Sequence, residues 1–270
     1  GGGANNPPPK TLTPKKKNAQ TEQKQTKPDK GYSRNPKKKK EGDNSYTKSF
    51  HQKLITSMGH PLMDAGDGFG KDIIEETLKK FPDCEVFICG PLLNFGEYFG
   101  DNPHHHLKKV TMQGGFLPYN QHNYNVEKLN KFIGKSMVPT FNLNGSKKQG
   151  IYLSKEAKID DLRFVGKNIC HTIIYDHQRH EWMKQVKPKD KSQELFINAM
   201  DMYLEKHSEK KFHDPTAAVC HLHPEIGTWV QGKLYNSKGC WGSFAITNTN
   251  THLLADIKCE SLWDYIREGK

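Results

Sequence analysis

Several histidines stand close together in the sequence, and histidine is both a metal ligand and a proton donor near neutral pH. His104, His105 and His106 are consecutive, so their side chains point in different directions on any regular backbone, and we interpret them as a solvated loop or a helix cap. His221 and His223 lie two residues apart. No cysteine or carboxylate has the spacing of a zinc site around them, so we expect surface or packing roles.

A second group of histidines lies in the middle of the chain. His171, His177 and His180 are expected on a helix, where the spacing of three residues places His177 and His180 side by side on a solvated face. Further along, His213 and Asp214 precede Pro215. Aspartate before proline at the start of a helix is a good N-cap, so a structural role and a chemical role both stay open for this pair.

The six cysteines are scattered and contain no CxxC pair. This pattern indicates buried or free thiols in a reducing compartment and excludes a disulfide framework. Cys89, Cys170 and Cys220 stand in apolar contexts and are expected to be core thiols, since nothing beside them indicates an activated nucleophile.

Lysine dominates the first part of the chain. Residues 1–45 hold twelve Lys and Arg against four Asp and Glu, a net charge of +8 out of +11 for the whole chain. Residues 1–48 contain too few apolar side chains to form a core, and we expect a disordered basic tail. Clustered lysines contact DNA or RNA phosphates or act as nuclear-localisation signals, and a merely solubilising tail is the alternative. The lysines in question are Lys15, Lys16, Lys17, Lys37, Lys38, Lys39 and Lys40.

From residue 49 to residue 270 the composition is that of a folded domain. Apolar periodicity predicts helices over 71–81, 92–99, 126–133 and 191–207, and strands over 85–89, 109–112, 151–153 and 162–165. A hairpin is predicted from 228–234 and 241–247, around Gly239. Alternating strands and helices favour an α/β fold with a mainly parallel, Rossmann-like sheet, helices on both faces and a small C-terminal antiparallel hairpin. Such sheets bind ligands at the carboxyl ends of their strands.

Composition excludes two classes of protein. No run of about 18 apolar residues is present, which excludes a membrane-spanning helix. A charged and then apolar leader is also missing at the start of these residues, so we expect an intracellular protein, nuclear or cytoplasmic.

Five short strings, in order, resemble the inosine–uridine-preferring nucleoside hydrolase family. Asp67-Gly68-Phe69-Gly70 looks like its HGxDGLG turn, and Cys89-Gly90-Pro91-Leu92-Leu93-Asn94 like its TGPLTNLA junction. Met112-Gln113-Gly114-Gly115 resembles its MGG strand end, Phe141-Asn142 its EFN, and Phe212-His213-Asp214-Pro215-Thr216-Ala217-Ala218 its HDPxA segment.

The resemblance implies particular roles in the hydrolysis of an N-glycosidic bond by a calcium-activated water. Asp214 corresponds to a calcium ligand, and Cys89 to the residue whose backbone carbonyl is another ligand. Asn142 corresponds to a ribose contact, and His213 to the acid that protonates the leaving base. Asp64 and Asp67 fall in the family's substrate-binding turn. Family members are usually dimers or tetramers, so self-association is implied as well.

The family's N-terminal DxDPGxDD motif is absent from these residues, and lysines stand in its place. The Glu of EFN, which grips the ribose hydroxyls, is Thr140. Calcium prefers several anionic oxygen ligands, and one carboxylate is too few to hold it. We therefore expect no cofactor and a catalytically inactive accessory subunit with protein partners, for example in a DNA adenine methyltransferase.

Two alternatives remain open. The metal-binding strand lies upstream or in a partner chain, which would complete an active calcium-dependent ribohydrolase. In the other alternative, the chain senses nucleosides through a pocket that hydrolyses nothing.

Overall fold

Residues 70–269 are the part of the chain that the computed structural model describes. The predicted lysine-rich tail and the candidate residues Asp64 and Asp67 lie outside the described residues. The described elements, in chain order, are α2 (Gly70–Lys80), β1 (Val86–Ile88), α3 (Leu93–Asp101), β2 (His106–Gln113), the 3-10 turn η1 (Asn130–Phe132), α4 (Phe141–Gly145), α5 (Lys147–Lys155), β3 (Lys158–Val165), α6 (Lys167–Cys170), β4 (Ile174–Asp176), α7 (His177–Lys184), α8 (Lys191–Leu204), β5 (Glu209–Lys211), α9 (His213–Leu222), the 3-10 turn η2 (Pro224–Ile226), β6 (Gly227–Ser237), β7 (Cys240–Ala245), β8 (Thr251–Ile257) and α10 (Cys259–Glu268).

A sheet in the order β1-β2-β3-β8-β6-β7 forms the centre of the described domain. Neighbours among β1, β2, β3 and β8 are parallel, whereas β6 is antiparallel to β8 and β7 is antiparallel to β6. The predicted α/β fold with a mainly parallel sheet and a C-terminal hairpin is therefore confirmed. A second, antiparallel sheet of β4 and β5 stands apart from it.

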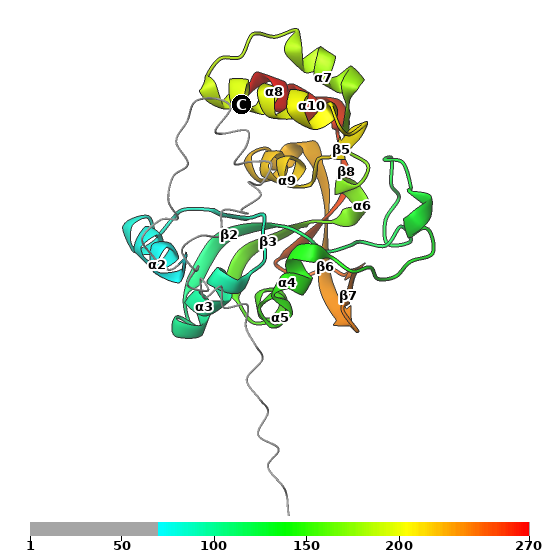
Figure 1. Ribbon diagram of the computed structural model, residues 1–270. Coiled ribbons are helices and arrows are strands. Elements are labelled where there is room, and N and C mark those ends of the chain that lie inside the picture. Colours follow the sequence, from blue (N-terminus) through cyan, green and yellow to red (C-terminus); the bar gives the residue numbers. More distant parts are fainter. Residues whose placement is uncertain (1–69, 270) are drawn as a thin grey trace, which may run out of the picture. The chain divides into compact units, whose positions relative to one another are not determined.

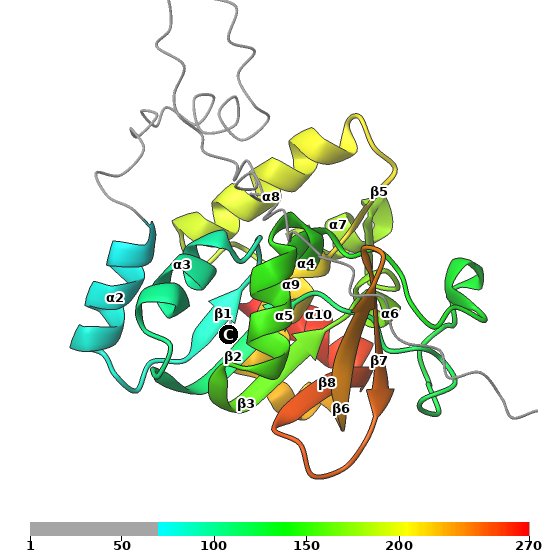
Figure 2. The same ribbon diagram turned by 90° about the horizontal axis from the view of Figure 1, so that it is seen from below.

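Helices cover both faces of the sheet. Helices α3, α4 and α5 lie on one face, and α9 with α10 lies on the other (Figures 1 and 2). Two cores result, because side chains of a strand point alternately to the two faces. Phe164 belongs to the core beneath α3 and α5, and the next residue, Val165, belongs to the core beneath α9 and α10.

Two helix starts follow directly from local sequence. The Asp176 carboxylate accepts a hydrogen bond from the Arg179 backbone N–H at 2.8 Å and so caps α7. Asp190 does the same for α8, accepting from the Gln193 N–H at 2.9 Å. Each bond satisfies a backbone donor that the first turn of a helix leaves without an intrahelical partner.

Two predicted elements are wrong. Residues 126–133 form only the short turn η1, because the Leu129 N–H donates to the Tyr119 hydroxyl at 3.0 Å instead of entering a helical ladder. Residues 151–153 belong to helix α5 and not to a strand. The buried residues of α5, Gly150 and Leu153, are three apart, which is helical spacing.

Three histidine predictions also need correction. His171 is not on a helix with His177 and His180, since it follows the end of α6 and α7 begins at His177. His106 is the first residue of β2 and lies 2.7 Å from Asp160, so it is not in a loop. His180 is only 3% exposed and is not on a solvated face. Its ring nitrogens contact the Tyr175 hydroxyl and the Asp201 carboxylate, both at 2.7 Å. His180 therefore joins β4, α7 and α8, a connection that periodicity does not reveal.

All six cysteines are free thiols, as predicted, and Cys170 and Cys220 are buried. Within residues 70–269, no helix has both the length and the apolar character needed to cross a membrane.

Candidate ligand site at the carboxyl ends of the strands

The ends of β2 and β3 are joined by backbone hydrogen bonds. The Gly114 N–H donates to the Val165 carbonyl and the Lys167 N–H donates to the Gly115 carbonyl, both at 3.0 Å. Gly115 has φ of +84°, a conformation that side chains rarely adopt. These bonds fix the first residues after both strands at the edge where parallel sheets bind ligands.

Asn142, the predicted ribose contact, is held at this edge. It is buried, and its side-chain amide donates to the Gln113 backbone carbonyl at 3.0 Å and to Gln113 Oε1 at 2.8 Å. Both amide hydrogens are therefore used within the protein, and Oδ1 is the side-chain atom left to contact a ligand.

His213 and Asp214 form the first turn of α9, the helix that crosses the face of the sheet. The N-cap residue of α9 is Phe212, and no side chain caps the helix. The N-cap role expected for Asp214 is therefore wrong. Asp214 is exposed, and its carboxylate is free of a capping bond.

Cys170 lies where three of these elements meet. Its thiol contacts the Val165 and His213 carbonyls, both at 3.7 Å, and accepts from the Gln113 side chain at 3.8 Å. Burial raises the pKa of the Cys170 thiol to about 12, so it is a neutral packing group.

Cys89 follows β1 and is exposed, so the prediction that it is a core thiol is wrong. Partial desolvation of the thiol, followed by the negative charge of Asp214, raises the pKa of Cys89. Asp214 is therefore near enough to Cys89 for its charge to act on the thiol.

Around His213 lies a group of lysines, together with His171, that the sequence interpretation did not bring together. We call it the basic cluster, and it consists of Lys131, Lys167, His171, Lys210, Lys211 and His213. The His171 and His213 rings have centroids 4.8 Å apart. The Lys131 Nζ donates to His171 Nδ1 at 2.8 Å, which places the proton of the neutral His171 ring on Nε2.

Two further contacts define the cluster. The Lys167 Nζ donates to the Pro139 carbonyl at 2.7 Å. The Nε2 atom of His213 is buried and has no hydrogen-bond partner among residues 70–269, nor has the Oγ1 atom of Thr140, which follows Pro139. Buried polar atoms without partners are rare in folded proteins, and each one needs a ligand, an ordered water or another explanation.

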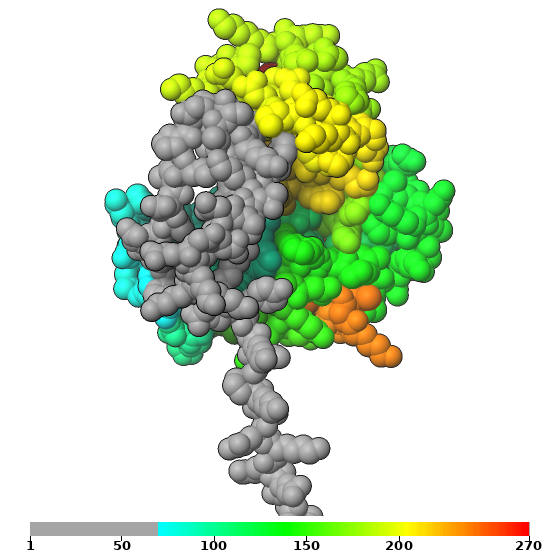
Figure 3. Space-filling model, in the orientation of Figure 1, coloured from blue at the N-terminus to red at the C-terminus, as the bar shows by residue number. Residues whose placement is uncertain are grey.

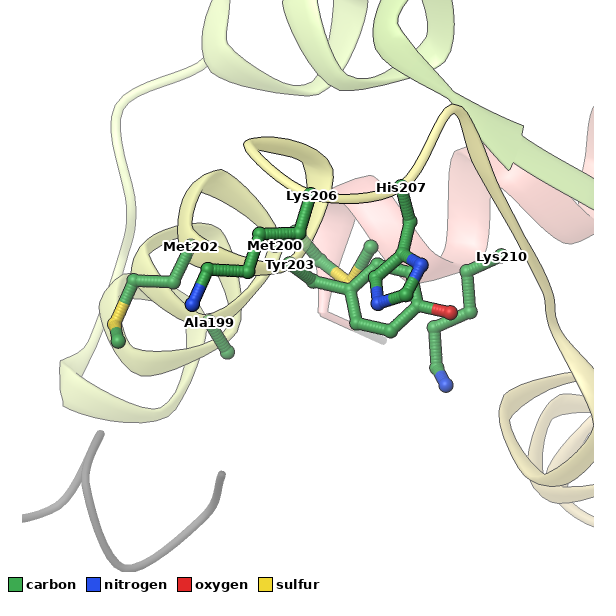
Figure 4. Close-up of a pocket in the computed structure, with 7 residues that line it drawn as sticks. All are labelled: Ala199, Met200, Met202, Tyr203, Lys206, His207 and Lys210. Atoms are coloured by element: carbon green, nitrogen blue, oxygen red, sulfur yellow. The ribbon is translucent and has the colours of Figure 1, made fainter. Parts of the chain in front are cut away.

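Lys210 connects the basic cluster to a neighbouring cavity of about 350 Å³ on α8. Figure 4 shows the Tyr203 and His207 rings lying against one another beside Lys210, and the Lys210 Nζ lies 4.7 Å from the centre of the Tyr203 ring. The other residues lining this cavity are Ala199, Met200, Met202 and Lys206.

Electrostatics at this edge disfavour further positive charge. Burial, followed by Lys131, lowers the pKa of His171 to about 3. The pKa of His213 is lowered by burial and then by Lys210, Lys167, Lys211 and Lys131. Burial also lowers the pKa values of Lys131 and Lys167. Both histidines are therefore neutral near pH 7, beside four lysines.

A calcium ion does not fit the described residues. Asp214 is the one carboxylate from the resemblance that they contain, and partial desolvation raises its pKa against the opposing effect of Lys210. Within residues 70–269, no group of three or more His, Cys, Asp or Glu side chains has the arrangement of a metal site. Calcium requires several anionic oxygens, and the surrounding lysines repel a divalent cation.

Sequence alone missed the grouping of these side chains because they come from three separated segments, at residue 131, over 167–171 and over 210–213. Among the lysines, Lys167 carried a local signal, since it stands two residues after a predicted strand, where ligand-binding residues collect. Lys131 and Lys210 have no such signal.

Comparison of the fold with solved structures finds nucleoside hydrolases. A plant nucleoside hydrolase has a TM-score of 0.56 at 18% identity, covering 77% of this chain and 68% of the plant enzyme. An inosine–guanosine nucleoside hydrolase has a TM-score of 0.56 at 13% identity, covering 78% and 68%. The inosine–uridine-preferring nucleoside hydrolase of Bacillus anthracis has a TM-score of 0.55 at 11% identity, covering 79% and 69%.

These likenesses show that residues 70–269 have the nucleoside hydrolase fold, and at this identity they show the fold alone. No protein-family model matches the chain. Among curated proteins, an uncharacterized protein of Aquifex aeolicus (strain VF5) is 29% identical over 169 residues, which cover 58% of this chain. The match spans about half, 54%, of that relative's length.

Proposed function

We propose that this chain is a nucleoside-hydrolase-like protein without hydrolase activity, which acts as an accessory subunit of a nucleic-acid complex. One observation carries the proposal: the ligand-binding edge of the fold presents four lysines around His213 where catalysis would require anionic metal ligands. Without a metal, the attacking water stays un-ionised near neutral pH.

The N-terminal lysines would supply the contact with DNA or RNA. Their clusters, Lys15–Lys17 and Lys37–Lys40, carry enough charge to neutralise several phosphates. Such binding is independent of base sequence and releases counterions, so it depends steeply on salt. A protein partner would then use the folded domain, and the site of action would be nuclear or cytoplasmic.

An assay for free ribose tests the first half of the proposal. The purified full chain, given millimolar calcium and inosine or uridine, should release no ribose at an enzyme-like turnover. A nucleoside hydrolase assayed in parallel is the positive control. Ribose release that is abolished by Asp214→Asn would overturn the proposal and favour the active hydrolase, in which the resemblance makes Asp214 a calcium ligand.

A salt titration tests the second half. Binding of a short DNA or RNA duplex should weaken by about a thousandfold between 50 and 200 mM salt if six or more phosphates are contacted. Deleting residues 1–45 should largely remove it. The matched variant replaces only the seven clustered lysines by glutamine, which keeps the length of the segment. Binding that is independent of salt, or unchanged in both variants, would contradict a role for these lysines.

A further inference from the structure

We propose that the basic cluster binds the phosphate group of a nucleoside monophosphate, with Lys131, Lys167 and Lys210 as the cations that hold it. This inference deepens the proposed function by naming the ligand of the folded domain, and it rests on that function. In this inference, the ligand is recognised through its phosphate group by the basic cluster, and not by a set of metal ligands.

The first argument is charge. Four lysines stand around the two histidines, and the carboxylates that act on the cluster are Glu209, which pairs with Lys211 at 2.9 Å, and Asp214. Among residues 70–269, two positive charges are therefore left unmatched. A phosphate monoester carries close to two negative charges at pH 7, whereas the diester of a nucleic-acid backbone carries one. The excess charge of the cluster matches a monoester.

The second argument is the helix beneath the cluster. Helix α9 is ten residues long and begins at His213, so its positive dipole end adds to the lysines. Lysines at the start of a helix are unfavourable by themselves, and an anion makes the arrangement favourable. Asp214 is a single anion in this first turn.

The third argument is the unmet hydrogen-bonding capacity. His213 Nε2 is buried without a partner, and Thr140 is 2% exposed with its Oγ1 also without a partner in the described part of the chain. Lys167 reaches the Pro139 carbonyl beside Thr140. Polar groups of this kind are satisfied by ligand oxygens or by waters that a ligand orders.

Compactness distinguishes a small ligand from a polymer. The two histidine rings are 4.8 Å apart, and Lys131 lies 2.8 Å from one of them. Lys167 and both histidines are partly buried, whereas Lys131 and Lys210 are exposed at the rim. A nucleic-acid backbone uses extended stripes of exposed cations, whereas cations gathered around two partly buried rings fit one terminal phosphate. Figure 3 shows α8 and the residues that follow it (yellow) and the segment after β2 (green) at the surface of one face.

Calorimetry on the full chain tests the inference with adenosine 5′-monophosphate, adenosine and inorganic phosphate as probes. We expect the monophosphate to bind at least tenfold more tightly than adenosine, and inorganic phosphate to compete with it. Lys131→Gln and Lys167→Gln should each weaken binding about tenfold. Lys210→Gln is a further variant that tests the same loss of binding, since Lys210 is exposed and its replacement leaves the core intact.

Two controls locate the site. Lys108→Gln removes a cation that pairs with Asp83 at the opposite end of the sheet, and it should leave binding unchanged. Replacing the seven clustered N-terminal lysines should also leave binding of the monophosphate unchanged. Near-ultraviolet circular dichroism establishes that each variant is folded.

Three results would overturn the inference: no binding of the monophosphate at millimolar concentration, equal binding of adenosine, or equal weakening by Lys108→Gln. Loss of duplex binding in the cluster variants, without any binding of the monophosphate, would assign the cluster to nucleic acid and overturn it too. Ribose release from inosine is a separate result, which defeats the proposed function and not the phosphate site.

Discussion

Each end of helix α9 has a histidine with lysine nearby, but the histidine at the C-terminal end is hydrogen-bonded and the one at the N-terminal end has an atom without a partner. At its C-terminal end, the Lys109 Nζ donates to the His221 carbonyl at 3.0 Å and pairs with Glu85 at 2.7 Å, while His221 Nδ1 lies 2.9 Å from the Thr111 hydroxyl. At its N-terminal end, the Nε2 atom of His213 has no partner in the described residues.

This difference separates a structural network from a ligand site. A cation at a helix C-terminus interacts favourably with the helix dipole and donates a hydrogen bond to a free carbonyl, so Lys109 stabilises the fold. Cations at the N-terminal end oppose the same dipole. Polar groups that are fully paired hold elements together, whereas a buried polar atom without a partner, beside charges of one sign, is available to a ligand of the opposite sign.

The largest expected effect is on stability, from a pair of variants at the two ends. Thr111→Val removes the hydroxyl that His221 contacts, in a position that is fully buried, and should cost about 1–3 kcal/mol of unfolding free energy. His213→Phe keeps a ring against His171 and removes a nitrogen that has no partner, so it should cost less than about 1 kcal/mol. Urea denaturation measures both, and an equal cost at both ends would break the distinction.

A smaller effect concerns pH. Burial and neighbouring lysines lower the pKa of His171 in the folded chain to about 3 from an ordinary value of 6.5. The unfolded chain therefore binds more protons between these values, and stability should fall as the pH drops from about 6.5 toward about 3. His171→Gln should reduce the pH dependence of the thermal unfolding midpoint over this range. His177→Gln, at an exposed position on α7, is the matched control and should leave the slope unchanged.

The smallest expected effect is on the pKa values of His213 and His221, the histidines at the two ends of α9. Lys210 is the first of the charges that lower the pKa of His213, so Lys210→Gln should raise that pKa. At the other end, Glu85 raises the pKa of His221 against burial and Lys109, so Glu85→Gln should lower it. Titration of the imidazole resonances by NMR follows both. A shift of the His213 pKa downward in Lys210→Gln would contradict the description of the cluster.

Much of the fold could be predicted because the apolar pattern of its longer elements repeats over many residues. The helix over 191–207 was expected from its apolar stripe and is α8, and the hairpin around Gly239 is β6 and β7. The predictions for residues 126–133 and 151–153 were wrong, because short apolar segments contain too few periods of the pattern to distinguish helix, strand and loop. In both cases tertiary contacts decided, through Tyr119 in one and the packing of Gly150 and Leu153 in the other.

The candidate site divides in the same way. Cys89, Asn142 and Asp214 were proposed from the resemblance to the nucleoside hydrolase motifs, which are short strings of neighbouring residues. Which of their atoms are occupied was not predictable: Asn142 gives both its amide hydrogens to Gln113, and Asp214 does not cap its helix.

The sequence by itself determined the alternation of strands and helices, the resemblance to nucleoside hydrolases and the charge of the first 45 residues, since each of these is a property of neighbouring residues. Only the tertiary structure decided that Lys131, Lys167 and Lys210 surround His171 and His213. These residues are far apart in the chain, and their electrostatic interaction depends on distance in space, which the fold alone sets.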